Sequence, residues 1–515
     1  MRHVCSYVVI LYVFSITETY KILGIFPICG QSHFTLGFRL MKELADRGHQ
    51  VSFINCFPQE KPIKNLKDIS VESIKSNLLK FYDMSSITQQ QKFSFYRWYK
   101  EASYFGNLLA TGLLKNENIH KLVKSNETFD LVISENFYFE FMTFFAYKFG
   151  APLIMISAGP VSFLSNYIFS NPAPSSYITN LFQFDTNSKM SLWERMENLY
   201  AEILGEFYMN FVQIPEQAGY LKQLVPDAPD LKKILYNTSL LLVASHLGVF
   251  GPVPLQQNVK EIGGYTIPQP QPLPKPIKDF LDNATEGVVI FSMGSMIKSS
   301  NFALDKKNIV LNAFSKIRQK VLWKFEEDLR DIPDNVQIFK WIPQSDVLNH
   351  PNVVAFISHG GLLGITEGLY YGVPILGIPV FYDQGRNIEL AAEIGYALKI
   401  NYNDLEEKAF EWALNEILNN PKYRDVAKQR SAIMRDQPTK ALDEAVFWCE
   451  YVVRHRGAFH LRSPAMDLKW YQLYQLDVFL LIFIIISTFI LLINNLLKYF
   501  IKRMTVTNIN DKKDK

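Results

Sequence analysis

A glycine-rich turn in the second half of the chain carries residue types that can bind a diphosphate. The apolar run 353–357 is typical of a buried parallel strand, and it ends at His359-Gly360-Gly361, after which an amphipathic helical pattern begins. Glycines let the backbone approach a ligand, and the unpaired N–H groups at a helix start favour an anion. His359 stands beside that anion position.

Two carboxylates and an amide follow at spacings suited to sugar hydroxyls. Glu367 lies about two helical turns after His359, where a carboxylate can accept hydrogen bonds from paired ribose hydroxyls. Asp383 and Gln384 follow the next apolar strand, 375–378, and so lie at its carboxyl end, where open α/β sheets bind ligands. The segment therefore predicts a nucleotide-sugar site.

A bare His-Gly-Gly turn more often only connects a strand to a helix. The whole segment from Phe356 to Gln384, however, resembles the signature of the UDP-glycosyltransferase family, whose animal members are called UDP-glucuronosyltransferases. The resemblance implies that Gly360, Gly361 and Gly364 help to bind a UDP-sugar. It extends to 456–463 and to an apolar segment near the carboxyl end, and so covers nearly the whole sequence.

Inverting glycosyl transfer needs a base on the acceptor hydroxyl, an in-line donor and stabilisation of the departing nucleoside diphosphate. In the family the base is a histidine just after the first strand, and His33 occupies that place. Taken alone, a histidine before a helix is more often a cap or a surface residue. With the donor signature present, we expect His33 to be the base.

The family orients this histidine with an aspartate at the end of a later strand. Here Glu135 stands in the matching position of segment 129–135, where many relatives have aspartate. Its role can survive the longer side chain, although the geometry is left open. Asp130 begins the same strand, far from its carboxyl end, and is the weaker candidate.

Two further segments resemble donor-binding motifs of the family. Trp341 would stack on uracil and Gln344 would hold the nucleoside, although an isolated motif of this kind is usually a core tryptophan before a turn. Gly294 and Ser295 follow the strand 288–291 and could approach the diphosphate, although such residues also serve ordinary turns. We find no metal-ligand spacing. In the family the helix terminus and His359 replace a divalent cation, so we expect no cofactor beyond the co-substrate.

The resemblance leaves the sugar and the acceptor open. Glucuronosyl enzymes are associated with an arginine before the linker, whereas segment 240–246 has none, which favours UDP-glucose over UDP-glucuronate. Aromatic residues at 93–99 and 137–145 serve mainly core packing, but some would line a pocket for small lipophilic hydroxyl compounds, as in detoxification. The alternative is a catalytically silent protein that binds a UDP-sugar or a lipophile. Glu135, in place of the family aspartate, keeps this alternative open. A homo-oligomer is also left open.

Strands and helices alternate in both halves of the chain, as in α/β proteins with doubly wound parallel sheets. Strands are predicted at 21–26, 51–55, 131–134, 153–156, 288–291, 321–323, 336–338, 353–357 and 375–378, and helices at 34–47 and 137–148. The family resemblance implies the GT-B fold, two Rossmann-like domains facing a cleft, with one transmembrane helix at the carboxyl end.

The expected organisation follows composition. It comprises a signal peptide (1–19), an acceptor-binding domain (20–266), a proline-rich linker (267–277), a UDP-sugar-binding domain (278–440), a helical segment returning to the first domain (441–475), a transmembrane helix (476–497) and a cytosolic tail (498–515).

The formal net charge of +3 gives no argument for nucleic-acid binding. Four cysteines, Cys5, Cys29, Cys56 and Cys449, lack metal-ligand spacing, and we expect Cys29 and Cys56 to be buried free thiols in apolar strand-like runs.

Targeting signals predict a single-pass type I protein of the endoplasmic reticulum membrane, with its catalytic domains in the lumen. Lysines and an arginine follow the apolar run 478–493, which by the positive-inside rule places the tail in the cytosol. The terminal lysines resemble a dilysine retention signal, the alternative being a solvated tail. Asn126, Asn237 and Asn283 each begin a glycosylation sequon.

Overall fold

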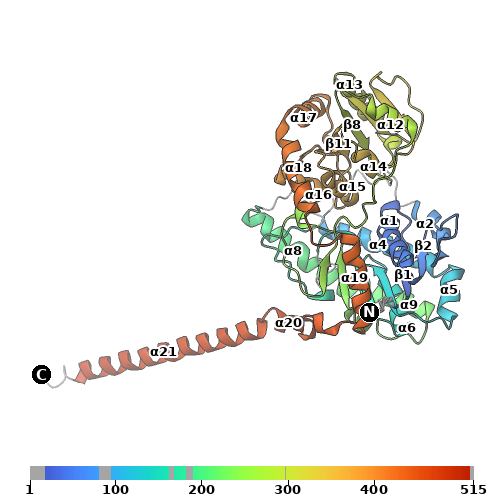
Figure 1. Ribbon diagram of the computed structural model, residues 1–515. Coiled ribbons are helices and arrows are strands. Elements are labelled where there is room, and N and C mark those ends of the chain that lie inside the picture. The colour runs from blue at the N-terminus through green and yellow to red at the C-terminus, as the bar shows by residue number, and fades with distance from the viewer. Residues whose placement is uncertain (1–17, 80–93, 162–167, 181–188, 296, 511–515) are drawn as a thin grey trace, which may run out of the picture. The chain divides into compact units, whose positions relative to one another are not determined.

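The structure, a computed structural model, describes residues 18–79, 94–161, 168–180, 189–295 and 297–510, with side chains to Arg503. Most of the predicted signal peptide, Cys5 and the terminal lysines lie outside the described residues. The chain divides into two compact units, one ending at Arg462 and one beginning at Ser463. Figure 1 shows the elements of each.

Within the described residues of the first half, seven parallel strands form one sheet in the order β3-β2-β1-β4-β5-β6-β7. Their runs are mostly apolar because helices cover both faces of such a sheet. The strands are β1 (Lys21–Phe26), β2 (Gln50–Asn55), β3 (Leu66–Ser70), β4 (Leu131–Glu135), β5 (Leu153–Ser157), β6 (Leu240–Val243) and β7 (Val259–Glu261). The order reverses between β1 and β4, which makes a crevice at their carboxyl ends.

The helices of this half are α1 (Gln31–Asp46), α2 (Lys75–Leu79), α4 (Phe95–Leu113), α5 (Glu117–Lys124), α6 (Phe144–Phe149), α8 (Leu192–Tyr208), α9 (Ile214–Leu224), α10 (Leu231–Tyr236) and α11 (Leu247–Phe250). The predicted helix 137–148 was wrong at its start. Residues 136–139 instead form a loop after β4, followed by a 3₁₀ turn at Glu140–Thr143 and then α6.

The second half repeats this plan. Among its described residues, six parallel strands lie in the order β10-β9-β8-β11-β12-β13, with the reversal between β8 and β11. The strands are β8 (Val288–Ser292), β9 (Lys320–Lys324), β10 (Val336–Phe339), β11 (Val353–Ser358), β12 (Ile375–Gly377) and β13 (Ala397–Lys399). The helices are α12 (Lys275–Asp282), α13 (Leu304–Ser315), α14 (Gln344–Leu348), α15 (Leu362–Tyr370), α16 (Gln384–Ile394), α17 (Glu407–Asn419) and α18 (Pro421–Arg435). Helix α12 begins inside the segment predicted as linker.

All nine predicted strands are present, with ends that differ by one residue at most. The edge strands β3, β7 and β13 were not predicted, because they are short or carry charged residues and show no long apolar run. The interior strand β6, a run of four apolar residues, was not predicted either. After the second sheet, α19 (Ala441–Arg454) packs its buried residues into the core that underlies the first sheet.

The second unit consists mainly of α20 (Trp470–Leu473) and α21 (Leu476–Asn510). Among the described residues, Leu476–Arg503 is the helical stretch that is long and apolar enough to cross a bilayer. The helix continues past the predicted boundary at residue 497, so the predicted tail begins as helix.

Candidate active site at the switch points of the two sheets

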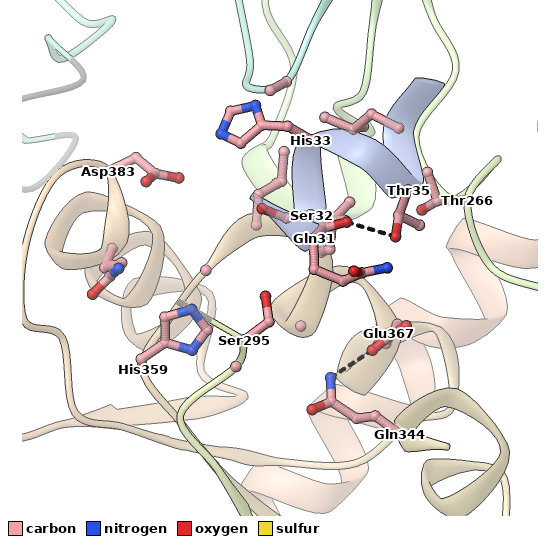
Figure 2. A pocket seen from close by; sticks show the side chains of 18 of the residues that line it. Gln31, Ser32, His33, Thr35, Thr266, Ser295, Gln344, His359, Glu367 and Asp383 are labelled. Atoms are coloured by element: carbon pink, nitrogen blue, oxygen red, sulfur yellow. Dashed lines mark hydrogen bonds between the residues drawn. The ribbon is translucent and has the colours of Figure 1, made fainter. Parts of the chain in front are cut away.

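A cavity of about 510 Å³ lies where the carboxyl ends of both sheets meet, and Figure 2 shows its polar lining. Most of the predicted site residues line this cavity. They are His33, Gly294, Ser295, Trp341, Gln344, His359, Gly361, Gly364, Glu367, Asp383 and Gln384. Glu135 and Gly360 do not line it but contact His33 and Ser358, which do. Segments more than 300 positions apart therefore converge on one space.

His33 and Glu135 form the closest polar pair at the cavity. His33 stands in the first turn of α1, and Glu135 is the last residue of β4, which pairs with β1. Nδ1 of His33 lies 2.5 Å from Oε1 of Glu135, whose side chain is fully buried. The longer glutamate side chain therefore reaches the histidine. Asp130 instead accepts a hydrogen bond from the Lys21 backbone N–H at the far end of β1.

The surroundings of His33 raise the pKa of its imidazole. Burial alone lowers the pKa of this imidazole, but the charge and hydrogen bond of Glu135, together with the charge of Asp383, outweigh burial and raise it above 6.5. Because Nδ1 is engaged by Glu135, Nε2 is the atom that can take a proton from a bound hydroxyl.

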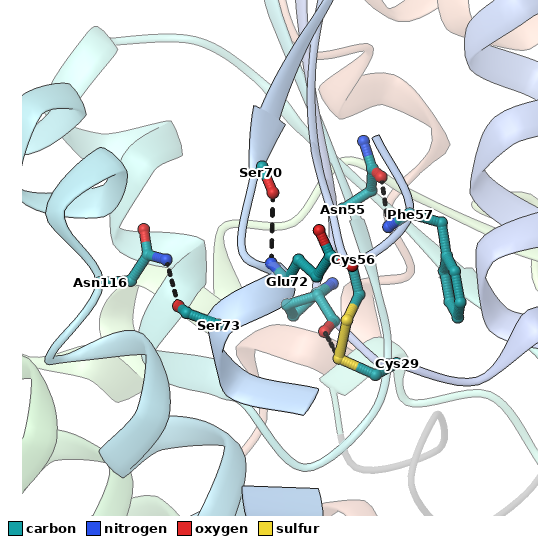
Figure 3. The surroundings of a disulfide bond; sticks show 9 residues. Cys29, Asn55, Cys56, Phe57, Ser70, Glu72, Ser73 and Asn116 are labelled. Carbon is teal, nitrogen blue, oxygen red and sulfur yellow. Dashed lines mark hydrogen bonds between the residues drawn. A yellow bond between two sulfur atoms is a disulfide. The ribbon is translucent and has the colours of Figure 1, made fainter. Parts of the chain in front are cut away.

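Helix α1 is fixed at its beginning by a disulfide between Cys29 and Cys56, shown in Figure 3. The prediction of free thiols at these positions was wrong. The two cysteines follow β1 and β2, which are parallel neighbours, so the strand order brings their Cα atoms to 5.1 Å. Cys449 is a buried free thiol.

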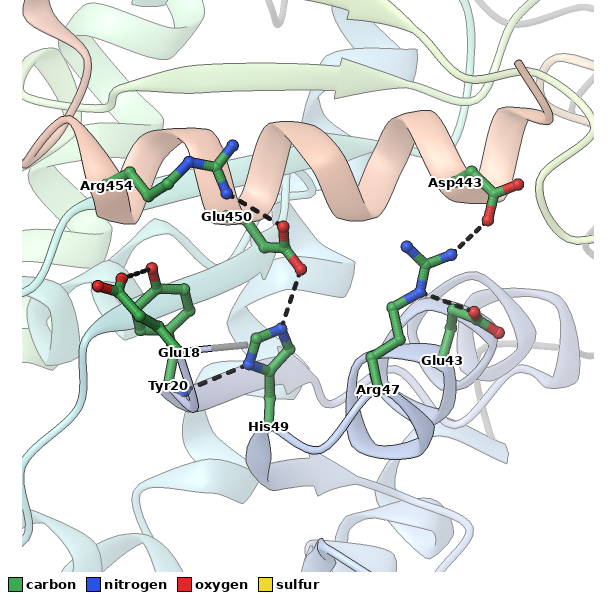
Figure 4. Close-up of polar contacts among 8 residues, drawn as sticks. All are labelled: Glu18, Tyr20, Glu43, Arg47, His49, Asp443, Glu450 and Arg454. Carbon is green, nitrogen blue, oxygen red and sulfur yellow. Dashed lines mark hydrogen bonds and ion pairs between the residues drawn. The ribbon is translucent and has the colours of Figure 1, made fainter. Parts of the chain in front are cut away.

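The other end of α1 is tied to α19, as Figure 4 shows. Arg47 forms ion pairs with Glu43 in α1 and with Asp443 in α19. Nε2 of His49 lies 3.3 Å from Oε1 of Glu450, also in α19. The helix that carries His33 is therefore held at both ends by residues distant in the sequence.

Glycine is required at two positions where the diphosphate is expected. Gly294 has a φ of 78°, and a Cβ there would lie 2.6 Å from the ring of His359. At Gly361, the residue before α15, a Cβ would lie 2.4 Å from Nε2 of His359. Any side chain at these positions would displace the His359 ring, whereas glycine leaves the backbone open beside His359 and the start of α15.

His359 is an uncharged hydrogen-bonding group in this setting. Burial, together with the charge of Lys324, lowers its pKa to about 4. Its Nδ1 is buried and has no partner among the described residues. A neutral imidazole with an unsatisfied ring nitrogen suits an oxygen-rich ligand such as a diphosphate.

Lys324, which the sequence analysis missed, supplies positive charge at this end of the cavity. It is the last residue of β9 and is 6% exposed. Its Nζ donates to the carbonyl of Gly294 at 2.9 Å and to Oε1 of Glu326 at 2.8 Å. The lysine at the end of Val-Leu-Trp-Lys was the available signal, because ligands bind at strand carboxyl ends.

Gln344 and Glu367, two of the residues predicted to bind the nucleoside, lie across the cavity from His33 (Figure 2). Trp341 is 62% exposed, so one face of its ring is available for stacking. Gln344 donates to Oε2 of Glu367 at 2.6 Å. Burial raises the pKa of Glu367 to about 7; the charge of Asp346 adds to that effect and the Gln344 hydrogen bond opposes it.

The sugar-binding candidates are positioned by their own helix, α16. Gln384 accepts backbone hydrogen bonds from Val380 and Phe381, which leaves its amide N–H groups for a ligand. Asp383 accepts from Nδ2 of Asn387 at 2.6 Å. Burial raises the pKa of Asp383, against the effects of Asn387 and of the His33 charge.

Apolar residues close the remainder of the cavity around His33. Ala102, Phe105, Phe137 and Tyr138 form this wall, and the ring of Phe137 meets His33 edge-on at a centroid distance of 5.3 Å. The aromatic residues predicted to line an acceptor pocket fall into two groups. Phe137 and Tyr138 line the cavity, whereas Trp98 and Tyr99 are buried in an aromatic core behind it.

Comparison with known proteins settles the family. Residues 31–511 match the model of the family described as UDP-glucoronosyl and UDP-glucosyl transferase. The chain belongs to this family. The UDP-glucosyltransferase 2 of Dactylopius coccus is 36% identical over 93% of this chain and 92% of that protein. The human UDP-glucuronosyltransferase 2B7 is 30% identical over 88% of each.

Solved structures agree on the fold. The calicheamicin glycosyltransferase CalG4 matches 84% of this chain and 99% of its own with a TM-score of 0.57 at 17% identity. A UDP-glucose:anthocyanidin 3-O-glucosyltransferase in complex with UDP matches 85% and 99%, with a TM-score of 0.57 at 16% identity. The predicted GT-B fold is confirmed.

This UDP-glycosyltransferase therefore transfers a glycosyl group from a UDP-sugar donor. The alternative of a catalytically silent binding protein gains no support from these comparisons. The helix Leu476–Arg503 is long and apolar enough to span a bilayer, which indicates that the enzyme is anchored in a membrane.

Proposed function

We propose that this enzyme transfers glucose, with inversion, from UDP-glucose to the hydroxyl of a small lipophilic acceptor. The observation that carries the mechanism is the His33–Glu135 pair, which lies across one cavity from His359 and the start of α15. A base and a diphosphate-binding end at opposite sides of a cavity suit in-line displacement.

In this mechanism Nε2 of His33 removes the proton of the acceptor hydroxyl while its oxygen attacks C1 of the sugar. The bond from C1 to the diphosphate oxygen breaks, and UDP leaves with the bonding electron pair. The proton remains on His33, where the Glu135 carboxylate stabilises the imidazolium. The apolar wall of Phe105, Phe137 and Tyr138 would receive the acceptor and exclude water.

We assign the donor to the other residues of the cavity. Trp341, Gln344 and Glu367 would hold uridine. Ser295, His359, Lys324 and the N–H groups at the start of α15 would hold the diphosphate, with no divalent cation taking part. Asp383 and Gln384 would bind sugar hydroxyls.

The choice of glucose rests on similarity. The Dactylopius coccus relative at 36% identity is called a glucosyltransferase. The missing arginine in segment 240–246 carries less weight, because β6 and the three residues after it do not line the cavity.

We place the catalytic unit in the lumen of the endoplasmic reticulum. Disulfides such as Cys29–Cys56 form in oxidising compartments, and all three sequon asparagines, Asn126, Asn237 and Asn283, are exposed. Lys498, Lys502 and Arg503 follow the apolar stretch, as expected for a cytosolic end.

A donor competition assay tests the proposal. Microsomes containing the enzyme receive UDP-glucose, UDP-glucuronate and UDP-galactose together, with a library of phenols and lipophilic alcohols, and the glycosides are identified by mass. We expect glucosides to dominate and His33→Ala to abolish them, whereas His455→Ala, an exposed histidine outside the cavity, retains activity. Glucuronides as the main product would overturn the donor assignment, and full activity of His33→Ala would overturn the base.

A further inference from the structure

Helix α8 has its apolar residues on the face that points away from the protein. Its buried positions are Asn198, Ala201, Gly205 and Tyr208, most of them small or polar. Asn198 fixes this inner face by donating to the backbone carbonyls of Ser175 and Ile178, each at 2.7 Å. The usual pattern of a surface helix is therefore reversed.

The outward face carries large side chains in a narrow sector. At 100° per residue, the sector that holds them spans about 120° and includes Leu192, Trp193, Met196, Leu199, Tyr200, Ile203, Phe207 and Phe211. We call this the α8 apolar face, and its main residues are 51–71% exposed: Trp193, Met196, Tyr200, Ile203, Phe207 and Phe211. Phe211 lies in the π-helical turn that continues α8.

One neighbouring aromatic adjoins this surface. The ring of Phe95 on α4 lies 6.5 Å from that of Tyr200. A contiguous apolar surface of this kind marks an interaction site in soluble domains. Trp and Tyr side chains are, in addition, those that proteins place at membrane–water interfaces.

The charges on α8 bear on what covers this face. The helix carries Glu194, Glu197, Glu202 and Glu206 against Arg195, a net charge of −3 from one positive and four negative residues. In a symmetric pair of copies, these carboxylates would face their own counterparts, which is unfavourable. A zwitterionic lipid surface imposes no such repulsion.

The membrane that anchors the chain is a lipid surface available to this face. Its candidate membrane-spanning helix, Leu476–Arg503, tethers the first unit to a bilayer. A tethered domain meets the membrane at high effective concentration, so an interfacial helix too weak to bind alone is sufficient. We infer that the α8 apolar face inserts into the headgroup region of the bilayer that anchors this chain, as a second membrane contact.

Proteolytic release tests this inference. The full chain, with a protease site introduced between residues 463 and 469, is reconstituted in phosphatidylcholine vesicles, cleaved and separated by flotation. We expect the cleaved first unit to stay with the vesicles. In the triple variant Met196→Glu, Ile203→Glu, Phe207→Glu, we expect at least about ten times more of it in the soluble fraction, because charged groups oppose insertion.

The matched control places glutamate at two other exposed apolar positions, Leu304 and Trp412, which are 71% and 62% exposed, and we expect it to stay bound. Equal thermal unfolding midpoints show that the triple variant folds. If it does not fold, Met196→Cys carrying a fluorophore replaces it, and quenching by lipid-borne quenchers is expected. Release of the unmodified unit as a monomer or dimer, or absence of quenching, overturns the inference.

Discussion

Nδ1 of His33 lies 2.5 Å from Oε1 of Glu135, although 102 positions separate the two residues. The contact exists because β4 lies beside β1, so the end of β4 and the first turn of α1 meet at the same edge of the sheet. Glu135 therefore completes the pair with His33.

The first prediction concerns the pH dependence of this pair. The raised pKa of His33 means that the base becomes protonated, and kcat/KM falls, as the pH drops through a value above 6.5. Glu135→Gln removes the charge that raises this pKa, so the acidic limb should move to lower pH while the plateau rate drops by about 10²-fold or more. Profiles of kcat/KM from pH 5 to 9 measure both effects. Asp130→Asn serves as control, and an unmoved acidic limb in Glu135→Gln would contradict the assignment.

The second prediction concerns Lys324. Its buried ammonium group donates to the carbonyl of Gly294, beside the expected diphosphate, and charge-assisted hydrogen bonds contribute about 1.5–3 kcal/mol. Lys324→Met should raise the KM for UDP-glucose by about 10- to 150-fold with a smaller effect on the acceptor KM. Lys340→Met, at a 70% exposed side chain, is the matched control. Equal donor KM values in both variants would exclude the role.

A third prediction follows from the neutral state of His359. With a pKa of about 4, His359 donates as an uncharged imidazole at both pH 6 and pH 8. Substituting His359→Gln, which keeps an N–H donor, should therefore preserve more donor affinity than His359→Ala, with a difference of about tenfold. Calorimetric titration with UDP-glucose at pH 6 and 8 gives the values. Identical affinities for the two variants would count against this hydrogen bond.

The fourth prediction concerns the protonation of Glu367, which, unlike that of an exposed glutamate, changes between pH 6 and pH 8. Its pKa of about 7 means that it is largely protonated at pH 6 and ionised at pH 8. A carboxylate accepts two ribose hydroxyls, so UDP-glucose should bind more tightly at pH 8 than at pH 6 in the absence of acceptor. Glu367→Gln should remove that pH dependence. Asp346→Asn should shift it to lower pH, because Asp346 raises the pKa of Glu367.

The fifth prediction concerns the disulfide before α1. The Cys29–Cys56 bond closes a loop of 27 residues, and loop entropy assigns it about 3.5 kcal/mol of the free energy of unfolding. The double variant Cys29→Ser, Cys56→Ser should lose that stability in denaturant unfolding. Its kcat should also fall, since His33 stands four residues after Cys29. Cys449→Ala, which removes the free thiol, is the control; a double variant as stable as wild type would refute the contribution.

Much of the fold and of the donor site could be predicted from the sequence. Apolar runs placed the central strands because a strand covered on both faces requires them. The segment from Phe356 to Gln384 was readable because its strand, glycine turn and helix start are contiguous, so that the backbone geometry depends on neighbouring residues alone.

Other features were decided only by the tertiary structure. Cys29 meets Cys56, and His33 meets Glu135, because of the order of strands in a sheet, which no local pattern specifies. Lys324 enters the cavity because β9 lies beside β8, and α8 exposes its apolar face because its small and polar face is the one that packs. The sequence by itself determined the local elements and the donor motif. Contacts between residues far apart in the chain depend on which elements pack together, and that choice minimises the free energy of the whole unit rather than of any segment.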